Sequence, residues 1–132
     1  MSSQTMMQRD RASASLGMEV VTDEPGHAVV RMPVRDDMLN GFDIIHGGLV
    51  FALADTAFAI ACNEDENVTV AAGADITFLK STTTGAVLTA TATRRALSGR
   101  TGLYDVTVVD DAGDAVAEFR GRSVTTRRTA PA

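Results

Sequence analysis

LVFALADTAFAIAC, residues 49–62, is the stretch of this sequence that decides the fold. Its side chains are apolar or small almost without interruption, and it is long enough for about four turns of helix. Asp55 is the one charged residue in it. A helix without a polar face is normally buried. The run therefore predicts a central helix that the rest of the chain encloses.

The sequence on both sides of this helix predicts β-structure. Residues 18–21 and 28–34 are β-rich runs separated by Glu24-Pro25-Gly26, a strong turn signal, so they predict a hairpin. After the helix, turn residues separate four Val- and Thr-rich runs, which predict three hairpin connections between antiparallel strands. One apolar helix with one antiparallel sheet predicts an α+β fold in which the sheet wraps around the helix. The four runs are 68–79, 86–96, 103–109 and 115–125.

The remaining segments are short, and 132 residues are expected to form a single domain, 1–132. Residues 5–16 predict a short helix that ends at Gly17, with Met6, Met7 and Leu16 as its apolar contacts. Residues 38–45 predict a loop in which Asn40-Gly41 favours positive φ. Residues 126–132 predict a loose C-terminal tail.

Composition and charge exclude several classes of protein. The first 20 residues have no apolar run that would make a secretory signal, and residues 49–62 are too short to span a bilayer, so we expect a cytoplasmic protein with no membrane partner. The net charge of −5 argues against nucleic acid as a partner. Cys62 is the only cysteine, and no Cys and His residues gather at the spacing of metal ligands, so no metal site is expected.

Asp55 is the most informative candidate for chemistry. It is the only acidic residue between Asp43 and Glu64, in the middle of the helix that is expected to be buried. Removing a carboxylate from water costs on the order of several kcal/mol unless it has a partner. Asp55 either meets an amide or an arginine and fixes the packing, or it is a catalytic carboxylate with a perturbed pKa, and the second interpretation is favoured.

His46-Gly47-Gly48 stands directly before the helix. The start of a helix exposes unpaired N–H groups, and glycines allow a ligand to approach the backbone closely, so the triplet suits an oxyanion hole. His46 could instead simply cap the helix. Cys62 is favoured as a small core residue over a nucleophile.

Seven short motifs occur together along the chain: Met38 to Gly41, His46 to Gly48, Leu53 to Ala59, Ala61 to Asn63, Phe78 to Lys80, Thr101 to Asp105 and Phe119 to Ser123. Their joint pattern resembles the PaaI-type thioesterases of phenylacetic acid degradation. The resemblance covers nearly the whole chain, and it implies a hotdog fold, an acyl-CoA substrate, thioester hydrolysis without a cofactor, and assembly as a dimer or a dimer of dimers with the active site between protomers.

The same resemblance implies roles for individual residues. Asp55 takes the place of the catalytic acid, as general base or as nucleophile. Gly47 and Gly48 match the amides that polarise the thioester carbonyl, His46 the histidine beside them, and Asn40 the polar partner of the attacking water. One departure is that the strand hydroxyl common in related enzymes is missing from residues 71–75. Either Asp75 or Thr77 substitutes for it, or nothing does.

The phosphates of CoA require cations. Lys80, Arg94, Arg100 and Arg122 are predicted to hold them, with Arg95 and Arg120 as further candidates. Two other functions remain open: a hotdog dehydratase acting on 3-hydroxyacyl thioesters, and a non-catalytic acyl-CoA-binding protein. Aryl-acetyl groups such as phenylacetyl or hydroxyphenylacetyl are the acyl groups that the resemblance implies.

Overall fold

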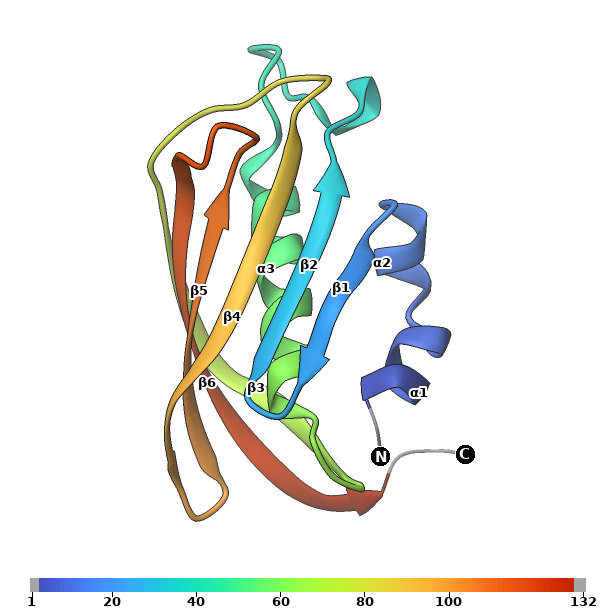
Figure 1. Ribbon diagram of the computed structural model, residues 1–132, viewed down its shortest axis with the longest axis vertical. Coiled ribbons are helices and arrows are strands. Elements are labelled where there is room, and N and C mark those ends of the chain that lie inside the picture. Colours follow the sequence, from blue (N-terminus) through green and yellow to red (C-terminus); the bar gives the residue numbers. More distant parts are fainter. Residues whose placement is uncertain (1–2, 130–132) are drawn as a thin grey trace.

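The computed structural model describes residues 3–129, in which one antiparallel sheet curves around one long helix (Figure 1). The helix is α3 (Gly47–Cys62), close to the predicted run. The strands are β1 (Glu19–Glu24), β2 (His27–Pro33), β3 (Asn67–Phe78), β4 (Val87–Ser98), β5 (Thr101–Val109) and β6 (Ala115–Thr129). This arrangement confirms the predicted α+β class with a sheet wrapped around a helix.

The core lies between α3 and the concave face of the sheet. Side chains alternate between buried and more exposed along β2, β4 and β5, as expected for a sheet with one covered face. From α3, Phe58 packs between Tyr104 and Phe119, with ring centroids 5.5 and 5.7 Å away. These contacts fix the rotation of α3 and thereby decide where Asp55 points.

The connection between β3 and β4 differs from the prediction. The sheet has the strand order β1-β2-β4-β5-β6-β3, so β3 pairs with β6 and not with β4. Only two of the three predicted hairpin connections exist, β4–β5 and β5–β6, together with the predicted β1–β2 hairpin. The segment 79–86 instead carries the chain from β3, at one edge of the sheet, past β6 and β5 to the position of β4 beside β2. β3 is consequently an edge strand, and most of its side chains are exposed.

The N-terminal region also differs from the prediction of one helix over residues 5–16. It forms two short helices, α1 (Ser3–Arg9) and α2 (Arg11–Ser15), which lie beside β1 (Figure 1). Asp10 separates them because its side chain caps α2 by accepting a hydrogen bond from the Ser13 amide, 2.9 Å away. Gly17 ends the segment with φ of 71°, as predicted.

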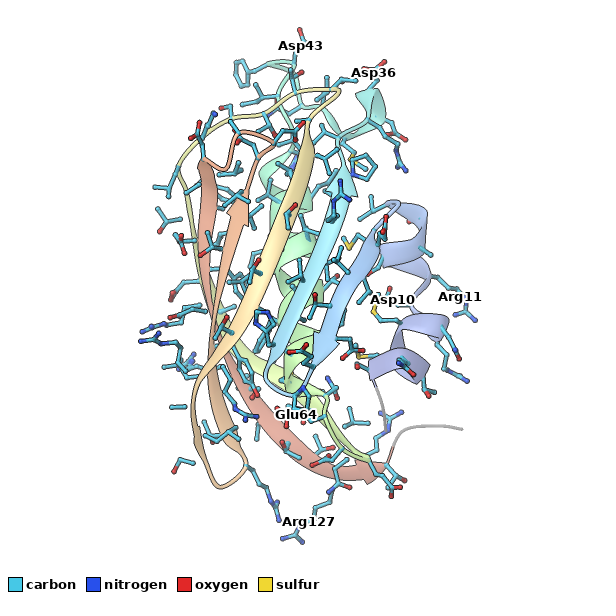
Figure 2. The ribbon with its side chains drawn as sticks, viewed as in Figure 1. Asp10, Arg11, Asp36, Asp43, Glu64 and Arg127 are labelled. Atoms are coloured by element: carbon cyan, nitrogen blue, oxygen red, sulfur yellow. The ribbon has the colours of Figure 1, made fainter. Side chains whose placement is uncertain are left out.

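Two smaller predictions are wrong. Residues 126–129 belong to β6 and not to a loose tail, while 130–132 lie outside the described residues. In the loop before α3, which follows a short 3-10 helix (Asp36–Met38), the positive φ of 61° falls on Asp43 and not on the Asn40-Gly41 pair. Asp43 and Asp36 mark this end of the molecule in Figure 2, and Glu64 and Arg127 lie toward the opposite end.

Candidate active site

α3 is not buried on all sides, contrary to the prediction. Gly48, Ala52, Asp55 and Ala59 follow one another at spacings of three or four residues, so they share one face of the helix, and that face is partly open. The sheet covers most of the other sides, and the short helices α1 and α2 also contact α3. Asp55 is therefore half-buried, on the one face of α3 that another molecule can still reach.

The carboxylate of Asp55 lies in the wall of a cavity of about 490 Å³, which we call the Asp55 cavity. Burial, and secondly the negative charge of Asp10, raise the pKa of Asp55 above its ordinary value. Within residues 3–129 this carboxylate has no hydrogen-bond or ion-pair partner. The other residues of the wall are Met6, Arg9, Asp10, Phe58, Ala59, Cys62, Asn63, Val68, Thr69, Val70, Ala71 and Arg128.

The backbone at the start of α3 offers one unused amide. His46 is the N-cap, and its Nδ1 accepts a hydrogen bond from the Gly48 amide at 3.3 Å. Its carbonyl accepts a further bond from the Leu49 amide at 2.9 Å. The Gly47 N–H, by contrast, has no acceptor among the described residues. Of the two predicted oxyanion donors, Gly48 thus has an internal partner and Gly47 remains available.

Gly47 faces a second cavity of about 280 Å³, the helix-start cavity. The ring of Phe78 lies against Gly47 so closely that an added Cβ would meet it at 3.1 Å. Asn40 contributes to the same wall, but its side-chain oxygen already accepts a bond from the Phe42 amide at 2.8 Å. The side-chain oxygen of Asn40 therefore stabilises the turn of its own loop and is already occupied. The other wall residues are Ile44, Ile45, Val50, Leu79, Lys80, Ser81 and Val116.

The two cavities are separate within one chain, because no residue lines both. Gly47 and Asp55 are eight residues apart on α3, which corresponds to about 12 Å along the helix axis. A base or nucleophile must lie within roughly 3 Å of the atom that it serves, or one water away. One chain therefore does not bring its own Gly47 and its own Asp55 to the same reacting atom.

The predicted CoA-binding cations fall into two groups. Lys80 pairs with Asp110 at 2.5 Å and with Asp114 at 2.7 Å, and Arg94 pairs with Glu64. Arg95 and Arg120 both pair with Asp105, at 3.4 and 2.6 Å. Arg100 and Arg122 have no carboxylate partner within residues 3–129. Among the predicted CoA-binding cations, these two arginines are the ones whose charge no carboxylate of the described residues neutralises.

Other predictions concern possible reactive groups, a metal site and a membrane span. Cys62 is buried, and burial raises the pKa of its thiol to about 12, which agrees with a core residue and not with a nucleophile. Asp75 and Thr77 are exposed on β3, and neither lines the Asp55 cavity. The described residues hold no cluster of three His, Cys, Asp or Glu side chains suited to a metal ion, and none of their helices has the length and hydropathy that a bilayer span requires.

Asp10 and Phe78 lie in these walls, although the sequence patterns around them did not indicate it. Asp10 reaches the Asp55 cavity from a segment 45 positions earlier in the chain. The Asp10-Arg-Ala-Ser13 pattern signals an N-cap, but it carries no information about which cavity the cap will face. Phe78 belongs to a quoted motif, yet its contact with Gly47 depends on the position of β3 beside α3.

Comparison with known proteins places these features in a family. Residues 42–117 match the family model described as the thioesterase superfamily. Over 118 residues the chain is 43% identical to the acyl-coenzyme A thioesterase PaaI of Escherichia coli (strain K12), an alignment that covers 89% of this chain and 84% of that protein.

Solved structures agree with this match. The structure of E. coli PaaI, from the phenylacetic acid degradation operon, aligns with a TM-score of 0.92 and 41% identity, covering 96% of this chain and 91% of that one. A point mutant of the phenylacetic acid degradation protein PaaI from Thermus thermophilus gives a TM-score of 0.85 and 38% identity, over 89% and 100% of the two chains. A Streptococcus mutans protein bound to acetyl-CoA gives 0.80 and 26%, over 86% and 91%.

Proposed function

The chain belongs to the thioesterase superfamily and is an acyl-CoA thioesterase of the hotdog fold, and we propose that it hydrolyses an aryl-acetyl-CoA to the free acid and CoA. The predicted enzyme class is thereby confirmed. The choice of acyl group is supported by the relatives named for phenylacetic acid degradation. We expect phenylacetyl or hydroxyphenylacetyl groups.

The observation that carries the proposal is the environment of Asp55. A carboxylate without a partner, half-buried and with a raised pKa, is kept available for proton transfer or attack. The cavity around it is lined largely by apolar side chains, among them Met6, Phe58 and Val70, which suits an aromatic or aliphatic acyl group. No cofactor enters the proposed reaction, because CoA is part of the substrate.

The proposed chemistry needs one donor and one carboxylate. The Gly47 amide receives the thioester oxygen and stabilises its developing negative charge by about 3 kcal/mol. Asp55 either takes a proton from the attacking water or attacks the carbonyl to give an anhydride that water then opens. In both routes water is consumed, the carbon–sulfur bond breaks, and the CoA sulfur leaves as a thiol.

The active site is proposed to form between two chains. Because one chain cannot bring Gly47 and Asp55 together, two α3 helices packed antiparallel through their open faces would place each Asp55 at the partner's helix-start cavity. The open, small-residue face of α3 and the exposed edge strand β3 support this arrangement. We propose a dimer or a dimer of dimers in the cytoplasm.

Arg100 and Arg122 are proposed to hold the CoA phosphates. Arg122→Ala is expected to raise KM for acyl-CoA roughly tenfold with little change in kcat, because one charge-assisted hydrogen bond contributes about 1.5 kcal/mol. Arg31→Ala, at an exposed position on β2, is the matched control and should leave KM unchanged. Steady-state kinetics with phenylacetyl-CoA measure both. Equal KM values for the two variants would remove Arg122 from the proposed binding site.

A panel of acyl-CoAs tests the function itself. Phenylacetyl-, hydroxyphenylacetyl-, benzoyl- and medium-chain acyl-CoAs are each incubated with the enzyme, and the release of free thiol is followed with a thiol reagent. We expect kcat/KM to be highest for the two aryl-acetyl thioesters. A higher value for a medium-chain substrate would contradict the proposed acyl group. Loss of water from a 3-hydroxyacyl-CoA without thiol release would indicate a dehydratase, and binding without turnover an acyl-CoA-binding protein.

A further inference from the structure

We propose that Asp10 is a positioning residue of this active site: from the cap of α2 it presents a second negative charge to the Asp55 cavity and makes Asp55 a stronger base. The inference rests on the proposed function, in which Asp55 acts on the thioester. Asp10 itself is assigned no contact with the substrate. Its role is to increase the proton affinity of the Asp55 carboxylate.

The first support is that Asp10 is fixed in place. Its side chain accepts two hydrogen bonds from Ser13, one from the amide at 2.9 Å and one from the hydroxyl at 2.7 Å. Ser13 is buried, and its Oγ lies 3.1 Å from Oγ1 of Thr56, the residue next to Asp55 on α3. Thr56 in turn donates to the Ala52 carbonyl at 2.9 Å. This chain of contacts ties the cap between α1 and α2, labelled in Figure 2, to the turn of α3 that carries Asp55.

The second support is the set of charges around the cavity. Besides the two aspartates, the titratable and charged wall residues are Arg9 from α1, Cys62 from α3 and Arg128 from β6. Cys62 is uncharged at neutral pH, because burial raises the pKa of its thiol to about 12. Burial, and after it the charge of Asp10, raise the pKa of Asp55. Among the charged wall residues, Asp10 is thus the one that makes Asp55 more basic.

The direction of the effect follows from like-charge repulsion. A negative Asp10 disfavours the ionised form of Asp55, so a more basic carboxylate is kept at the site. Proton abstraction by a positioned base becomes more effective as its pKa approaches the working pH. Neutralising Asp10 should consequently make Asp55 ionise at lower pH and act as a weaker base.

The experiment compares pH profiles. Asp10→Asn removes the charge but keeps a good N-cap, and Asp10→Ser is a second neutral cap in case the first variant folds poorly. For both we expect the acid limb of the kcat/KM profile to lie at lower pH than in the wild type, with a lower kcat on the plateau. Glu19→Gln, which removes an exposed carboxylate on β1, should keep the wild-type profile. Hydrolysis of phenylacetyl-CoA is followed with a dithiopyridine reagent, which detects thiols in acid.

Separate outcomes decide the inference and the function beneath it. An acid limb at the wild-type pH in folded Asp10→Asn and Asp10→Ser would overturn the role of Asp10. The proposed function would survive that result if Asp55→Asn is inactive in the same assay, because the loss would still assign the reaction to Asp55. A shift in the two neutral variants but not in Glu19→Gln supports the inference, because a merely structural cap would change the melting temperature and not the pH of the limb.

Discussion

Asp55→Asn is expected to lose hydrolysis by about 100-fold or more in kcat while the fold stays intact. The amide matches the carboxylate in shape, and the site offers no hydrogen bond or ion pair within residues 3–129 that the change would break. The substituted amide would neither accept a proton at neutral pH nor attack a carbonyl, so both proposed roles of the carboxylate are lost. Thiol release from phenylacetyl-CoA measures the loss. A variant with even half the kcat of the wild type would remove Asp55 from the mechanism.

The stability of the same variant provides an independent check of the environment of Asp55. Because the pKa of Asp55 is raised in the folded state, its contribution to stability is fully present below the unfolded-state pKa and is lost as pH rises through the folded-state pKa. At neutral pH the carboxylate therefore opposes folding. Asp55→Asn should unfold at the same or a higher denaturant concentration than the wild type at neutral pH, and any difference should shrink in acid.

Mixing two inactive variants is expected to restore about a quarter of the wild-type activity. Gly47→Val places a branched side chain beside the helix-start amide, in a space where the Cβ alone would meet the Phe78 ring at 3.1 Å, so the thioester oxygen should no longer reach that amide. Asp55→Asn removes the carboxylate. If each site takes Gly47 from one chain and Asp55 from the other, a hybrid dimer contains one intact site and one doubly damaged site. Random exchange makes about half of the dimers hybrid, which gives the quarter.

The matched control is exchange between two differently tagged preparations of Asp55→Asn. No combination of these chains rebuilds a site, so no activity should return, although the tags prove that chains have exchanged. Both variants should also keep a wild-type circular dichroism spectrum. If the Gly47→Val and Asp55→Asn mixture likewise stays inactive after proven exchange, each site lies within a single chain and the proposed arrangement is wrong.

Local sequence patterns were sufficient to predict the central helix α3 and the unusual position of Asp55 in it. The run at 49–62 predicts α3 because an almost uninterrupted apolar segment of that length has few other stable placements. Asp55 stands out for the same reason, since a charge is conspicuous only against an apolar background. The Glu24-Pro25-Gly26 turn likewise predicts the β1–β2 hairpin. The helix-start triplet His46-Gly47-Gly48 was also identified from the sequence, and the family resemblance supported its interpretation as an oxyanion hole, but neither distinguished Gly47 from Gly48.

What the sequence could not provide depends on long-range pairing. Nothing in residues 79–86 distinguishes a hairpin loop from a crossing connection, and only the pairing of β3 with β6 decides it. Residues 126–129 form part of β6 because β3 is present to pair with them, although their own composition resembles a tail. The hydrogen bond from Gly48 to His46, which leaves Gly47 as the free amide, also requires coordinates. The position of Asp10 in the wall of the Asp55 cavity likewise requires coordinates.

The separation of the two cavities along α3 has a thermodynamic consequence. A substrate that is held by the Gly47 side of one chain and the Asp55 side of the other binds the associated state and not the isolated chain. By mass action such a ligand shifts the monomer–dimer equilibrium toward association, by an amount that grows with its concentration relative to its Kd. If the site is shared between chains as proposed, substrate binding and self-association are linked functions, and the acyl-CoA concentration would help to determine how much of this enzyme is assembled.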